Sequence, residues 1–180
     1  MTKSFNPFES RTCRDIRNEL GSALIESIRE NSLEKVRTLA KHVLAVQDDP
    51  EVNGYVSDRL LRYKGVMEGV EAARLSPGDI YDIAHLLWQE GLFFECHEWL
   101  EQIWSSVEGR EKTILQALIR STAAFEFIAY GRTRGAFLAG SKALKVLVRN
   151  PDHIPKQIHI RSKVEELQRV LNALSGDSFT

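Results

Sequence analysis

Apolar residues recur every three or four positions through most of the chain, which is the spacing that gives an α-helix one buried face. This pattern predicts three helices in the N-terminal part, over residues 10–31, 33–47 and 52–74. Ser76-Pro77-Gly78-Asp79 then has the composition of a helix start, with Ser76 as a cap and Pro77 in the first turn. Five further helices follow, over residues 76–90, 92–108, 110–130, 134–148 and 162–174, with a loop over 151–160. The pattern therefore predicts an all-α fold.

Glycines at positions 91, 109 and 131 separate the predicted helices of the C-terminal part. Connections this short imply that successive helices are antiparallel neighbours. We expect a compact array of antiparallel helices: a five-helix core domain over residues 76–180, with residues 1–75 forming a three-helix extension packed on it. No internal repeat is evident.

Composition excludes several classes of protein. The chain has 180 residues, 43% of them apolar, with 24 Lys and Arg against 25 Asp and Glu, a formal net charge of −1. A chain of this kind can build a hydrophobic core, and its charge gives no reason to expect nucleic acid as a partner. No apolar run is long enough for a signal peptide or a membrane span, and two distant cysteines make no disulfide framework. We expect a cytoplasmic protein without a membrane partner.

The run Phe93-Phe94-Glu95-Cys96-His97-Glu98-Trp99-Leu100-Glu101-Gln102-Ile103-Trp104 carries the candidate chemistry. On a helix, the side chains of His97, Glu98 and Glu101 gather on one side, next to an apolar stripe. An imidazole with a carboxylate one turn away can bind a divalent metal, with His97 and Glu101 as ligands, or can act as a general base. It can also be an internal polar pair at the edge of the core. Helical spacing places Trp104 beside His97 and turns Trp99 away, so Trp99 is expected at a subunit contact.

Gln116 and Arg120 lie one turn apart on the following predicted helix. Both can reach toward Glu98 or Glu101, either as a structural salt bridge or as groups that orient a bound ligand. The sequence from residue 75 to 109 holds seven acidic residues and no Lys or Arg, which favours such pairing.

These motifs together resemble a prokaryotic family, domain of unknown function 309. The shared pattern is F-F-E-x-H-E-x-L-E-x-x-W, then L-Q-x-L-I, then a glycine turn and G-A, and it covers about residues 79–147. The resemblance implies a compact all-helical domain without an assigned reaction. It places the family's recurrent polar residues at Glu95, His97, Glu98, Glu101 and Gln116, with Trp104 beside them. Three departures stand out: Ala117 replaces a glycine, Arg132 stands where an asparagine often follows the turn glycine, and Glu126-Phe127 stands where a late histidine is frequent. The last of these weakens the metal interpretation.

Two functional hypotheses follow. The first is a non-catalytic interaction or scaffold module, acting with a protein partner or as a homodimer, in which the His-Glu-Gln cluster is an internal polar network. The alternative is a small-ligand or metal-binding protein, including a metal-assisted hydrolase, with its site between the His97 and Gln116 helices and Arg120 orienting the ligand. A sealed and mutually bonded cluster favours the first hypothesis, and an open one favours the second.

Overall fold

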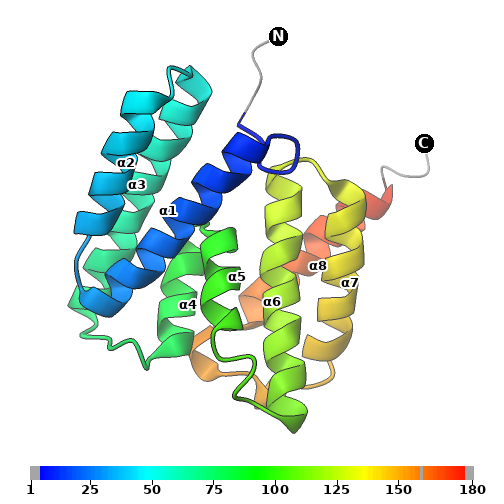
Figure 1. Ribbon diagram of the computed structural model, residues 1–180. Coiled ribbons are helices and arrows are strands. Elements are labelled where there is room, and N and C mark those ends of the chain that lie inside the picture. Colours follow the sequence, from blue (N-terminus) through cyan, green and yellow to red (C-terminus); the bar gives the residue numbers. More distant parts are fainter. Residues whose placement is uncertain (1–4, 159, 177–180) are drawn as a thin grey trace. The chain divides into compact units, whose positions relative to one another are not determined.

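The structure, a computed structural model, describes residues 5–158 and 160–176 (Figure 1). Within these residues it contains eight α-helices, two short 3-10 helices and no β-strand. The all-α prediction is confirmed. The chain divides into two compact units, Met1–Asp79 and Ile80–Thr180, and each is described by itself.

The first unit consists of three helices: α1 (Arg11–Glu30), α2 (Glu34–Val46) and α3 (Pro50–Ala72). Side-chain caps start two of them, because the hydroxyl of Ser10 accepts from the backbone N–H of Cys13 and the carboxylate of Asp49 accepts from that of Glu51. Helix α2 packs against both α1 and α3. The core of the unit is formed by fully buried apolar side chains from all three helices: Leu20, Leu24, Val36, Val56 and Tyr63.

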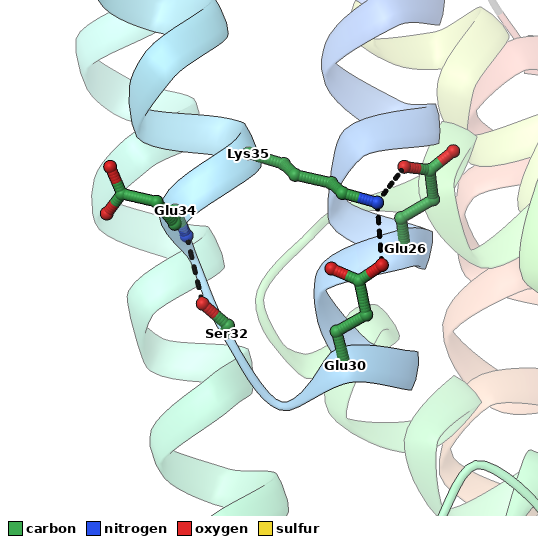
Figure 2. Close-up of polar contacts among 5 residues, drawn as sticks. All are labelled: Glu26, Glu30, Ser32, Glu34 and Lys35. Carbon is green, nitrogen blue, oxygen red and sulfur yellow. Dashed lines mark hydrogen bonds and ion pairs between the residues drawn. The ribbon is translucent and has the colours of Figure 1, made fainter.

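An exposed ion-pair fork joins α1 to the start of α2 (Figure 2). Lys35 Nζ lies 2.9 Å from Glu26 Oε2 and 2.6 Å from Glu30 Oε1. The hydrogen bond and the charge of Lys35 lower the pKa of Glu26, and its bonds to Glu30 and Glu26 raise the pKa of Lys35. The Lys35 ammonium thus forms ion pairs with carboxylates on two successive turns of α1.

The second unit contains five helices: α4 (Ile80–Gln89), α5 (Phe93–Glu101), α6 (Gly109–Ala129), α7 (Thr133–Leu147) and α8 (Ile160–Gly176). Two short 3-10 helices, η1 (Pro151–His153) and η2 (Lys156–Ile158), connect α7 to α8. Helix α6 lies between α5 and α7, while α8 packs on α7 and α4 packs on α5 and η2 (Figure 1). Helix α6 is therefore the structural centre of this unit.

Aromatic rings and small residues close the core of the second unit. Trp88 meets Phe125 edge to face at 5.3 Å, and Phe93 stacks on Phe125 at 5.1 Å between ring centroids. Gly140 allows α7 to approach α8, because a Cβ atom there would lie 3.0 Å from the side chain of Leu171. Helix α5 is held against α6 by these contacts, which positions the candidate site.

Three predicted boundaries are wrong. The predicted helix over 92–108 ends at Glu101, because residues 102–106 form turns with i to i+3 bonds and the Ser106 hydroxyl donates to the carbonyl of Ile103. Helix α4 begins at Ile80 and not at Ser76, since Asp79 accepts from both the backbone and the hydroxyl of Ser76 and closes a turn there. The loop expected over 151–160 contains η1 and η2, and α8 already starts at Ile160.

Candidate functional site

Helix α5 presents a polar edge beside its buried face. The helix starts after Gly91, whose positive φ of 67° suits a residue without a Cβ, and it buries Cys96, Trp99 and Leu100. His97 and Glu98 are half-buried, and Glu101 is exposed. The local sequence therefore places an imidazole and two carboxylates at the border between core and solvent.

His97 is held by the neighbouring helix α6. Its Nδ1 lies 3.3 Å from the carbonyl oxygen of Ile119 and 3.5 Å from the hydroxyl oxygen of Thr122. The Thr122 hydroxyl donates its only hydrogen to the Ile119 carbonyl at 2.7 Å. Both oxygens therefore turn lone pairs toward Nδ1, which must carry a hydrogen. This backbone contact fixes the ring orientation in the way that second-shell partners orient metal-binding histidines.

The second ring nitrogen faces Glu101. Nε2 of His97 lies 3.3 Å from Glu101 Oε1, and their side chains are 25% and 54% exposed. With Nδ1 protonated, a neutral imidazole turns the lone pair of Nε2 toward a carboxylate oxygen. Two lone pairs at this distance repel each other unless a proton or a cation lies between them. A proton or a cation between His97 Nε2 and Glu101 Oε1 would therefore stabilise this arrangement.

Glu98 completes a cluster of three ligand atoms. One ligand atom from each of His97, Glu98 and Glu101 lies within 4.8 Å of the other two. Ligands of a single tetrahedral zinc ion lie about 3.3 Å apart, so modest rotations of the two glutamate side chains would bring the three atoms to bonding positions. Two carboxylates and a neutral imidazole carry a charge of −2, which a divalent cation balances. The donor set fits such an ion.

Other predicted site residues lie outside this three-ligand cluster. Glu95 is fully buried in the core of the unit, on the same helix. Trp104 follows the end of α5, is 39% exposed, and stacks under the Lys112 ammonium at 4.1 Å from the ring centroid. Gln116 and Arg120 are half-buried on α6, on the stretch that also carries Ile119. In the described part of the chain, Glu101 pairs with His97, and no salt bridge links Arg120 to Glu98 or Glu101.

The expectation that Trp99 lies at a subunit contact is wrong. Trp99 is 1% exposed, and its indole N–H donates to the carbonyl oxygen of Ile80 at 3.0 Å. The first turn of α4 covers the side of α5 that helical spacing alone assigns to solvent. Trp99 is a core residue with its polar atom satisfied.

Sequence reasoning missed two residues that hold the site together. Thr122 and the backbone carbonyl of Ile119 orient the His97 ring and favour the tautomer with a hydrogen on Nδ1, and neither residue type indicates such a role. A threonine inside a helix usually returns its hydroxyl to a preceding carbonyl, so its sequence position alone carries no signal. Only the packing of α5 on α6 reveals the contact.

A comparison with protein families matches one segment of the second unit. Residues 81–138 are similar to a domain of unknown function, DUF309. The resemblance stated from the sequence is confirmed. The DUF309-like segment runs from the start of α4 into α7 and contains the His97 cluster with its α6 partners. No curated protein and no solved structure matches the chain.

Proposed function

We propose that the protein binds a divalent metal ion through His97, Glu98 and Glu101 in its DUF309-like segment. The observation that carries this proposal is the grouping of one ligand atom from each of the three residues within 4.8 Å, with His97 Nε2 3.3 Å from Glu101 Oε1 and Nδ1 in contact with α6. Nitrogen and carboxylate ligands of this kind suit zinc, manganese or iron.

The exposure of the cluster supports a binding site over a sealed polar network. A quarter of the His97 side chain and half of the Glu101 side chain are open to solvent. Trp104 lies under Lys112 and remains exposed, so it does not close the cluster. A metal ion and a ligand could reach the three residues from solution.

Such a site has coordination positions left for water or substrate. Three protein ligands with an open position are the arrangement of catalytic zinc sites, in which the metal lowers the pKa of bound water. Arg120, half-buried on α6 one residue after Ile119, has no ion-pair partner among the described residues, and we propose that it orients an anionic substrate. A metal-assisted hydrolase is the activity that these groups support.

The test is metal content and metal affinity of untagged protein prepared without chelator. We expect about one ion per chain by elemental analysis. Isothermal titration with Zn²⁺ and Mn²⁺ should show binding that falls about tenfold or more in His97→Ala and in Glu101→Gln.

His42→Ala and Glu108→Gln are the matched controls, because both residues are exposed and lie outside the cluster. They should bind metal like the parent protein. Absence of metal in the purified protein, together with no heat of binding for either ion, would exclude the proposal.

A second candidate function is a helical interaction module that forms a homodimer. Helix α7 favours it, because Phe137 and Leu138 are 42% and 52% exposed and Val148, directly after the helix, is 58% exposed. Neighbouring exposed apolar side chains mark protein contacts more often than isolated ones do. The two functions use different surfaces and are compatible.

A further inference from the structure

A cavity of about 410 Å³ lies at the start of α6, within the second unit. Its wall is built from three segments that are distant in sequence: Tyr81 at the start of α4, Arg110 and Glu111 in the first turn of α6, and the η1–η2 connection with His153 and Lys156. This volume falls within the range of small-molecule sites. None of these residues belongs to the motifs around His97 and Gln116.

The cavity is separate from the His97 cluster. Arg110 and Ile119 are nine positions apart on α6, which corresponds to about 13 Å along a helix axis. The cavity is lined by Arg110 and Ile114, which lie four positions apart on one row of the helix surface, whereas the His97 contact is made by Ile119, on another row. A ligand in the cavity would therefore not touch the proposed metal ligands.

Two cationic side chains in the cavity wall indicate that the ligand is an anion. Arg110 Nη1 donates to His153 Nε2 at 2.7 Å, which ties η1 to α6, and among the described residues the other guanidinium donors have no partner. Lys156 has no ion pair within the described residues. With the carboxylate of Glu111, these two cations leave a net charge of one positive unit around the cavity, which favours an anionic ligand.

Tyr81 adds a hydrogen-bond donor to the wall. Burial raises the pKa of Tyr81, and the negative charge of Glu111 raises it further. The phenol therefore keeps its proton at neutral pH and can donate to an acceptor oxygen. Ile114 and Ile154, both buried, supply an apolar surface beside these polar groups.

We propose that this cavity binds a small organic anion, with its carboxylate or phosphate head held by Arg110 and Lys156 and its apolar body against Ile114 and Ile154. Guanidinium and ammonium groups are the side chains that bind such heads most strongly. The proposal is independent of metal binding by the His97 cluster.

The test is isothermal titration of the whole protein with benzoate and with phenyl phosphate, which carry the two head groups on one apolar ring. Benzyl alcohol is the neutral control ligand of similar shape. We expect both anions to bind, and the tighter one identifies the head group. Loss of one charge-assisted contact in Arg110→Gln or Lys156→Gln should weaken binding about tenfold.

Lys145→Gln, an exposed cation on α7, is the matched control variant and should bind like the parent protein. Circular dichroism of each variant checks that the fold is retained. The proposal is overturned if neither anion binds at millimolar concentration, or if Arg110→Gln and Lys156→Gln bind as the parent does. It is also overturned if His97→Ala reduces anion binding as much as they do.

Discussion

At the scale of single residues, the two tryptophans near the candidate site have opposite environments. Trp99 is 1% exposed and bonds the carbonyl of Ile80, whereas Trp104 is 39% exposed and contacts Lys112. Their neighbouring positions in the sequence conceal this difference. The effect of a phenylalanine substitution on the free energy of unfolding should therefore differ between Trp99 and Trp104.

We expect Trp99→Phe to lower the free energy of unfolding by about 1 to 3 kcal/mol, because it removes a buried hydrogen bond and leaves a void. Trp104→Phe should change it by less than about 0.5 kcal/mol, as for most surface substitutions. Urea unfolding followed by circular dichroism measures both. Equal effects of the two substitutions would contradict the assignment of Trp99 to the core.

The candidate site could be predicted from the sequence only in part. Helical spacing correctly grouped His97, Glu98 and Glu101, since all three lie within one uninterrupted helix. The same spacing does not determine the position of Trp104, because α5 ends at Glu101 and helical angles cannot be extended past that point. It failed for Trp99 because α4, a separate helix, covers it.

At the scale of elements, the Lys35 fork adds hydrogen bonds and charge pairing to the packing between α1 and α2 (Figure 2). The pKa of Glu26 is lowered in the folded protein, so its contribution to stability is present above its unfolded pKa and is lost as the pH falls through the folded value. The pKa of Lys35 is raised, so its contribution is lost only as the pH rises through that value.

The comparison of wild type with Lys35→Met tests this linkage. The two proteins should differ most in unfolding free energy at neutral pH and low salt, and the difference should shrink in acid, as Glu26 becomes protonated, and in high salt. Urea unfolding across a pH series measures it. A difference that stays constant from neutral pH into acid would show that the pairing of Lys35 with Glu26 does not contribute to stability.

Periodicity located the helices themselves better than their ends. Each predicted helix exists, because a buried stripe is a property of many residues together. The ends depend on single local contacts, such as the Ser106 hydroxyl at the end of α5 or the Asp79 carboxylate before α4. The cavity at the start of α6 was not predicted, since its wall joins residues from three separate segments.

At the scale of the whole molecule, the local distribution of charged and exposed apolar residues says more about protein contacts than the net charge of −1 does. The segment from residue 132 to 149 contains five basic residues and no acidic one, and it includes the exposed Phe137 and Leu138 of α7. None of the described helices has the length and apolar content needed to span a bilayer. The apolar side chains of α7 are thus the basis for the proposed self-association.

We expect sedimentation velocity to show a monomer–dimer equilibrium for the wild type, shifted toward monomer in a Phe137→Ser/Leu138→Ser variant. Removal of the apolar anchors of an interface weakens association most strongly. Leu61→Ser is the control, because Leu61 is 72% exposed on α3, in the other unit. A wild type that remains monomeric at all concentrations would exclude the homodimer.

The contact between His97 and α6 also determines the regiochemistry of the imidazole. The inner nitrogen, Nδ1, is enclosed by the Ile119 carbonyl and the Thr122 hydroxyl, while the outer nitrogen, Nε2, faces the exposed Glu101. An electrophile from solution therefore meets only the outer nitrogen. Acylation or alkylation of this histidine would give one of the two isomeric products, and helix α6 decides which one.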